Sequence, residues 1–111
     1  MNIQNLASKA GAAEGFLKAL ANRHRLMILC ELHEGERSVS ALQNAIGLTQ
    51  SVLSQHLARL RKDGLVTTRR AAQTIYYSLA SDHVTKIIAL LHEFYCSPAC
   101  GEPSKRKGRK L

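Results

Sequence analysis

The sequence lacks the features that would identify a membrane-spanning, secreted or disulfide-stabilised protein. It has no run of about 18 apolar residues, so we expect no segment that spans a membrane. Residues 1–16 do not join a basic segment to an apolar core, so we expect no secretory signal and predict a cytoplasmic location. There are only three cysteines, an odd number, and cytoplasmic thiols are normally reduced. A disulfide scaffold is therefore disfavoured.

Acidic residues are also scarce. The 111 residues include 16 Lys and Arg against 8 Asp and Glu, which gives a formal net charge of +8. Five of the basic residues lie within residues 105–110, and residues 1–100 hold 11 basic against 7 acidic residues, a net charge of +4. A basic chain favours a polyanionic partner such as nucleic acid. The basic residues do not follow one face of an amphipathic helix, which disfavours a membrane surface.

Apolar spacing and helix caps predict one domain over residues 1–100, followed by a disordered basic tail at residues 101–111. Asn22, Ser38, Thr49 and Ser81 are candidate N-caps. The expected helices cover about residues 4–21, 22–35, 38–46, 49–64 and 81–95, and β-branched and aromatic residues predict strands at 65–70 and 74–80. A short helix, a tight turn and a second helix form a helix-turn-helix. The following hairpin forms a wing, so the predicted fold is a mainly α winged helix-turn-helix.

The predicted fourth helix has a polar face suited to DNA. We expect Val52, Leu53, Leu57 and Leu60 to point inward, and amides and hydroxyls to point outward at the start of the helix. Such groups can hydrogen-bond to base edges in the major groove, while basic residues flanking them bind the phosphate backbone. Alone, this face would equally suit an ordinary amphipathic helix, but the preceding capped helix and the basic hairpin favour DNA. The predicted DNA-binding residues are Thr49, Gln50, Ser51, Ser54, Gln55, His56, Arg59, Arg61, Lys62, Arg69, Arg70 and Gln73.

Residues 51–79, SVLSQHLARLRKDGLVTTRRAAQTIYYSL, resemble the recognition helix and wing of the ArsR/SmtB family of bacterial winged-helix repressors. Residues 17–32 resemble the family's opening, and the similarity extends over about residues 14–96. Ala72 departs from the pattern, because many relatives have glycine in the wing turn. The resemblance implies a homodimer that binds a palindromic operator in double-stranded DNA, joined mainly by its first and last helices. The implied dimer interface comprises Leu6, Ala10, Ala13, Leu17, Val84, Ile87, Ile88 and Leu91.

Many members of this family bind metals, but the corresponding residues argue against two of their metal sites. Ser38 and Ser40 stand where one site has thiolates, and serine is a poor ligand for soft metals. Another site needs spaced ligands on the last helix, where this chain has the adjacent pairs Asp82–His83 and His92–Glu93. Adjacent helical side chains diverge by about 100°, so they would not converge easily on one ion. We predict no metal and no cofactor, and a metal-responsive repressor remains the less favoured alternative.

The cysteines have two interpretations. Cys30 could be a simple core residue and Cys96 an incidental residue at a helix end. Together, however, they resemble the persulfide-sensing branch of the family, the BigR and SqrR types, and the related HlyU regulators. That resemblance implies a dithiol switch in which reactive sulfur species link the two thiols and DNA affinity falls. Cys100 is interpreted as a bystander or an accessory thiol.

Two histidines are candidate neighbours of these thiols, because His33 follows Cys30 by three residues and His92 precedes Cys96 by four. The ordinary interpretation of each is an exposed surface side chain. A virulence-gene activator or antirepressor with a general redox switch remains the alternative function, as does a nonspecific DNA binder that uses the basic tail. An oxidoreductase is disfavoured, because the chain has C-x-x-x-C and no βαβ unit. We therefore predict a regulator and not an enzyme.

Overall fold

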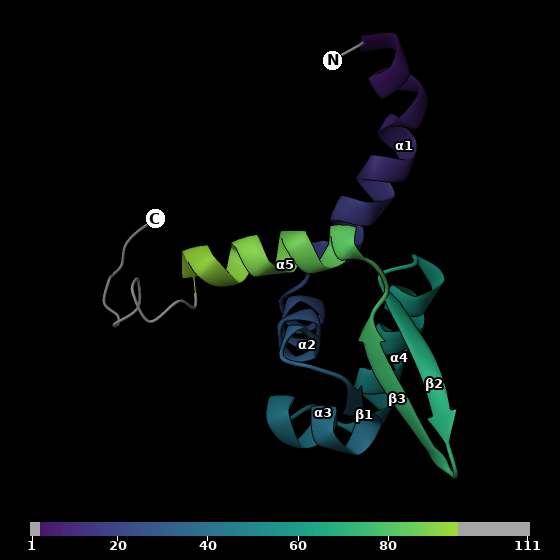
Figure 1. The fold of residues 1–111 in the computed structure, drawn as a ribbon, viewed down its shortest axis with the longest axis vertical. Helices are drawn as coiled ribbons and strands as arrows, with labels where there is room; N and C mark the ends of the chain where they lie inside the picture. Colours follow the sequence, from purple (N-terminus) through teal and green to yellow (C-terminus); the bar gives the residue numbers. More distant parts are fainter. Residues whose placement is uncertain (1–2, 96–111) are drawn as a thin grey trace.

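A computed structural model describes residues 3–95, which form a winged helix-turn-helix (Figure 1). Its elements are α1 (Ile3–Leu20), α2 (Arg23–His33), β1 (Arg37–Ser38), α3 (Val39–Ile46), α4 (Gln50–Lys62), β2 (Val66–Ala71), β3 (Thr74–Leu79) and α5 (Asp82–Tyr95). The predicted five helices and the hairpin are confirmed. The basic tail, Cys96 and Cys100 lie outside the described residues.

The helices begin at the predicted caps. The Asn22 side chain accepts hydrogen bonds from the backbone N–H groups of His24 and Arg25, at 3.0 and 3.1 Å. The hydroxyls of Ser38 and Thr49 do the same for the first turns of α3 and α4. These side chains satisfy backbone donors that have no partner inside the helix. Local sequence therefore defines where α2, α3 and α4 start.

The structure adds one strand that the sequence did not predict. β1 pairs antiparallel with β3, so the sheet order is β1-β3-β2 and the wing is joined to the segment that leads into α3. In the hairpin, Thr68 lies opposite Tyr77 and Arg69 lies opposite Tyr76. Because successive residues of a strand point to opposite faces, Tyr76 and Arg69 share one face of the wing and Tyr77 and Thr68 the other.

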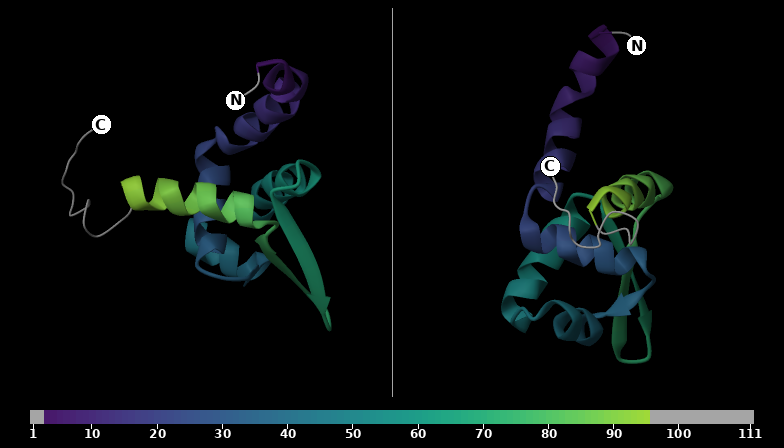
Figure 2. Two further views of the ribbon diagram at one scale, coloured as in Figure 1. Left: turned by 45° about the horizontal axis from the view of Figure 1, so that its top comes forward. Right: turned by 90° about the vertical axis from the view of Figure 1, so that its left-hand side faces the viewer.

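The core lies where α2, α4 and the base of the hairpin meet α5. Its buried residues are Ala19, Leu20, Ile28, Leu29, Leu32, Leu42, Leu53, Leu57, Leu60, Leu65, Val66, Val84 and Ile88. α5 lies across α2, whereas α1 stands away from the body in every view (Figures 1 and 2) and buries only its last two residues. Within residues 3–95, no helix is both long and apolar enough to span a membrane.

Candidate nucleic-acid interface

α4 is held by one leucine face and presents the opposite face to solvent. Leu53, Leu57 and Leu60 are buried, and the polar residues at the start of the helix are exposed. The prediction that Val52 points inward is wrong, because 37% of its surface is exposed. Val52 lies in the first turn of α4, beside the polar residues Gln50, Ser51, Ser54 and Gln55. The exposed face therefore offers amides, hydroxyls and one apolar contact, a combination that suits base edges and a thymine methyl group.

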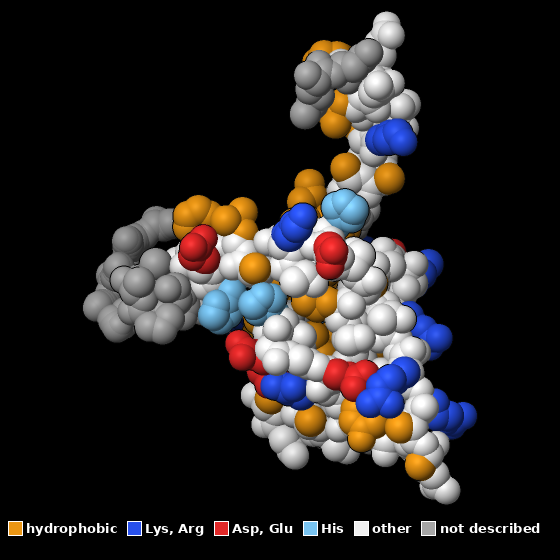
Figure 3. All heavy atoms as spheres, in the orientation of Figure 1, with side chains coloured by type: hydrophobic (Ala, Val, Ile, Leu, Met, Phe, Trp, Pro, Cys, Tyr) orange, Lys and Arg blue, Asp and Glu red, His pale blue; other side chains and the backbone are white. Residues whose placement is uncertain are grey.

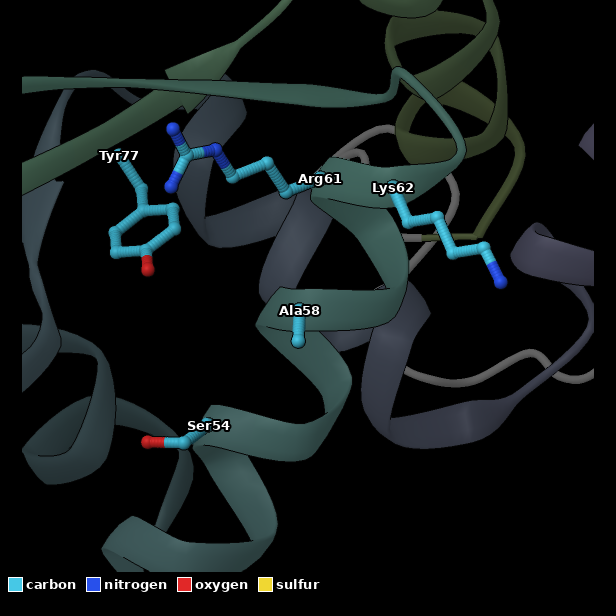
Figure 4. Close-up of a pocket in the computed structure, with 5 residues that line it drawn as sticks. All are labelled: Ser54, Ala58, Arg61, Lys62 and Tyr77. Atoms are coloured by element: carbon cyan, nitrogen blue, oxygen red, sulfur yellow. The ribbon is translucent and has the colours of Figure 1, made fainter.

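A hollow of ≈ 470 Å³ lies between α4 and the wing (Figure 4). It is lined by Ser54, Ala58, Arg61, Lys62 and Tyr77. The first three share one face of α4, because they are spaced at i, i+4 and i+7. Tyr77 was not among the predicted DNA-binding residues, although strand alternation, once the pairing is known, places it on the side of the wing that faces α4. The hollow thus combines apolar surface with a hydroxyl and two cations, and it is open to a polyanion.

The structure separates the predicted basic residues into two groups. Arg59 binds Asp63, with Nε 2.7 Å from the carboxylate, and Arg69 binds Glu36. In the part of the chain that the structure describes, no ion pair involves Arg61, Lys62 or Arg70. Arg61 and Lys62 line the hollow and Arg70 lies in β2, and all three are exposed. Gln73 and Thr49 are also exposed, at the wing turn and at the start of α4.

His56 differs from the other predicted DNA-binding residues of α4. It is half-buried on the side of α4 that faces α2, and its ring centroid lies 5.7 Å from that of His24. Burial lowers the pKa of His56 below its usual 6.5, and the positive charge of Arg25 and then that of His24 act in the same direction. The neutral form of the His56 imidazole, on the side of α4 that faces α2, is therefore favoured.

A second cluster lies where α2 meets α5. The rings of His33 and His92 stack with their centroids 5.7 Å apart and an interplanar angle of 29°, and Nε2 of His92 lies 3.9 Å from a carboxylate oxygen of Glu34. Both histidines are half-buried, which corrects their interpretation as exposed surface residues. Cys30 is half-buried one turn earlier on α2 and packs against the core.

No three His, Cys, Asp or Glu side chains within residues 3–95 are grouped so that they could hold a metal ion. The two adjacent pairs weighed as ligands lie at opposite ends of α5, Asp82–His83 in its first turn and His92–Glu93 in its last. The contacts of His92 described above are with the ring of His33 and with the side-chain carboxylate of Glu34, the C-cap residue of α2.

Exposed apolar side chains gather on α1 and near the end of α5 (Figure 3). Leu17 is 61% exposed and Phe94 62% exposed. Of the residues predicted for the dimer interface, Leu6, Ala10, Ala13 and Leu17 are exposed, whereas Ile87 and Leu91 are half-buried. Val84 and Ile88 are 2% and 0% exposed, so both belong to the core of one protomer and cannot offer a partner a surface. Nothing within residues 3–95 covers these two apolar faces.

A helix-turn-helix with an amide-bearing second helix, followed by a basic wing, defines a DNA-binding protein of the winged-helix class. The profile described as "Bacterial regulatory protein, arsR family" matches residues 22–68. The chain is 51% identical over 96 residues to the transcriptional activator HlyU of Vibrio cholerae, covering 86% of this chain and 89% of that protein. It is 44% identical over 82 residues to the biofilm growth-associated repressor of Agrobacterium fabrum, covering 74% of this chain and 70% of that protein. The chain belongs to the ArsR family, whose members here are DNA-binding transcriptional regulators and not enzymes.

Solved structures agree with this assignment. The structure of reduced HlyU from Vibrio cholerae matches with a TM-score of 0.81 at 49% identity, over 86% of this chain and 100% of that chain. A homodimeric winged helix-turn-helix domain from Mycobacterium bovis matches with a TM-score of 0.75 at 30% identity, over 96% of this chain and 97% of that chain. The winged-helix fold is confirmed, and it occurs in a relative that is a homodimer.

Proposed function

We propose that this regulator binds a palindromic operator as a cytoplasmic homodimer and releases it when reactive sulfur species link Cys30 to Cys96. The observation that carries the proposal is the contact between α2 and α5. Cys30 lies one turn before His33, whose ring stacks on His92, and Cys96 comes four residues after His92 in the sequence. The two helices therefore meet beside Cys30, and Cys96 follows the last described residue of α5 in the sequence, which supports their linkage within one protomer.

The chemistry requires a thiolate and a sulfane sulfur. A cysteine thiolate attacks the outer sulfur of a persulfide, takes it up as a protein persulfide and releases the donor's thiolate. The thiolate of the second cysteine then attacks Sγ of the first, which breaks the persulfide S–S bond, forms the disulfide and releases the outer sulfur as hydrosulfide. A direct disulfide needs Cα atoms about 4.4–6.8 Å apart, whereas a bridge with additional sulfur spans a longer gap. Either link would fix α2 against α5 and so change how the helix-turn-helix is presented to DNA.

The switch is tested by measuring operator affinity at one salt concentration, before and after treatment with a persulfide donor. We expect the reduced protein to bind and the treated protein to lose affinity, while Cys30→Ser and Cys96→Ser keep it. Cys100→Ser is the matched control and should respond like the unaltered chain. Intact mass would show whether the chain loses two hydrogen atoms or gains sulfur. An unchanged affinity after treatment, or a response that persists in both variants, would rule the switch out.

The proposed DNA contacts follow from the exposed face of α4 and the hollow beside it. Gln50, Ser51, Ser54 and Gln55 would read bases, since they are exposed at the start of the helix. Arg61 and Lys62, which line the hollow together with Tyr77, and Arg70 of the wing would bind phosphates. The proposed dimer joins the exposed apolar face of α1 to Ile87, Leu91 and the neighbouring exposed residues of α5.

An activator or antirepressor role is the second candidate. The 51% identity to a protein named transcriptional activator HlyU favours it. Mapping the bound promoters in cells and comparing their transcripts with and without the gene separates the two roles, because a repressor's targets rise on deletion and an activator's fall. Metal analysis of the purified, reduced protein distinguishes both from a metal-responsive repressor.

A further inference from the structure

The wing carries an arginine that is bound by a carboxylate from a distant part of the chain. Nε and a terminal guanidinium nitrogen of Arg69 donate to the two carboxylate oxygens of Glu36, at 2.7 and 2.8 Å. The Arg69 guanidinium carbon also lies 4.8 Å from the centroid of the Tyr76 ring. Most exposed ion pairs contribute little to stability. The Glu36–Arg69 pair is bidentate, and the Arg69 guanidinium also lies against the face of the Tyr76 ring. Both features strengthen an ion pair.

The geometry of the sheet places this arrangement on the side of the wing that does not face α4. Arg69 lies opposite Tyr76, while the next residue of β3, Tyr77, lines the hollow beside α4. Strand alternation therefore directs Arg69 away from the hollow and Arg70 toward the face of Tyr77. Two neighbouring arginines of equal charge thus have different surroundings.

Glu36 stands one residue before β1, and β1 leads directly into α3. A two-stranded hairpin is marginally stable by itself, and β1 adds only two residues of pairing to it. The Glu36–Arg69–Tyr76 contacts connect the residue before β1 with β2 and β3. They connect the projecting wing to the start of the helix-turn-helix.

We propose that Glu36 is a positioning residue for DNA binding, which holds the wing at a fixed angle to the helix-turn-helix through Arg69 and Tyr76. Arg69 is then not a DNA contact, although its charge and position in the wing led us to predict one. This inference depends on DNA binding by the family and is independent of the thiol switch.

The direction in which one substitution changes DNA affinity separates a positioning role of Glu36 from phosphate binding by Arg69. Glu36→Gln removes a negative charge and releases Arg69. If Arg69 bound phosphate, the variant would bind DNA more tightly, because both changes favour a polyanion. If Glu36 positions the wing, the variant binds its operator less tightly in spite of the more positive net charge.

The experiment uses the reduced, full-length protein and two duplexes, one selected by the protein from a randomised pool and one scrambled duplex of equal length. We expect Glu36→Gln and Arg69→Gln each to weaken binding to the selected duplex by about threefold to fivefold, with little change in salt dependence. Arg70→Gln should weaken binding to both duplexes and reduce the slope of log affinity against log salt by about 0.9. Glu14→Gln, an equal charge change on α1, should leave the selected-duplex affinity unchanged.

The exchanged variant Glu36→Arg/Arg69→Glu should regain most of the lost affinity, and thermal unfolding of each variant shows whether the fold is intact. If Glu36→Gln folds poorly, the exchanged variant still decides the matter, since only a paired contact is restored by exchange. Tighter or unchanged binding by Glu36→Gln, or a salt slope for Arg69→Gln that falls as in Arg70→Gln, would overturn the proposal.

Discussion

At the scale of single residues, charge alone does not decide which side chains of this protein are available to DNA. Arg25 donates to the backbone carbonyls of Ala19 and Lys18 at the end of α1, and Arg59 binds Asp63. Such arginines complete the protein's own hydrogen bonding, which a count of basic residues does not show. The sequence located the basic helix and wing correctly, but the partner of each arginine depends on residues that only the fold brings together.

His56 provides a pH-dependent prediction at this scale. Its pKa in the folded protein is lowered, so the unfolded chain binds more protons as the pH falls below the usual value of 6.5. Its contribution to stability is therefore fully present above that pH and is lost as the pH falls toward the lowered value. We expect His56→Gln to reduce the loss of stability between neutral and mildly acidic pH, measured by chemical denaturation.

The exposed His83 of α5 supplies the control for this measurement. His83→Gln should leave the pH dependence close to that of the unaltered protein. An equally steep acid loss in His56→Gln would show that other groups carry the effect.

At the scale of elements, the helices were predictable because their signals are local. Side-chain caps and apolar spacing lie within each segment, and Asn22, Ser38 and Thr49 cap as expected. β1 was missed because two residues carry no periodicity, and only the edge of β3 makes them a strand. Val52 was assigned to the wrong face because apolar spacing within a helix does not show whether other elements cover its first turn. The partners of His33 and Arg69 come from distant segments and required the fold.

The wing turn gives a prediction for one element. Ala72 adopts φ = 57°, a left-handed conformation that costs a residue with a Cβ about 1–2 kcal/mol. Glycine avoids that cost but loses more conformational freedom on folding, by roughly 0.5–1 kcal/mol. We expect Ala72→Gly to raise the free energy of unfolding by about 0.5–1 kcal/mol, measured in urea. Ala72→Val should destabilise the protein, and a stabilising valine would contradict this account of the turn.

At the scale of the whole molecule, the exposed apolar faces of α1 and α5 supply the surface of the proposed dimer. α1 contributes only Ala19 and Leu20 to the core, while Ile3, Leu6 and Leu17 are exposed. Burying such a side chain contributes about 1.5–3 kcal/mol. A two-fold interface would bury each of them twice, once in each protomer.

The proposed dimer is tested by placing a charge on the exposed apolar face of α1. We expect Leu17→Glu to dissociate the dimer at micromolar concentration and to weaken operator binding by far more than tenfold, because half-sites would then bind independently. Sedimentation gives the mass and a gel shift gives the affinity. Ile75→Glu, which alters an exposed apolar residue of the wing, should remain dimeric. A dimeric Leu17→Glu protein would move the interface away from α1.

The way α1 stands apart from the body also ties regulation to mass action. In the proposed dimer, a helix with so little of its surface covered within the protomer gains most of its stability from association, so we expect the thermal midpoint to rise with protein concentration. Below the dissociation constant of the dimer, the amount of DNA-binding species then varies with the square of the protomer concentration. A modest change in synthesis or turnover of this protein would produce a steeper change in operator occupancy, without any change in inducer.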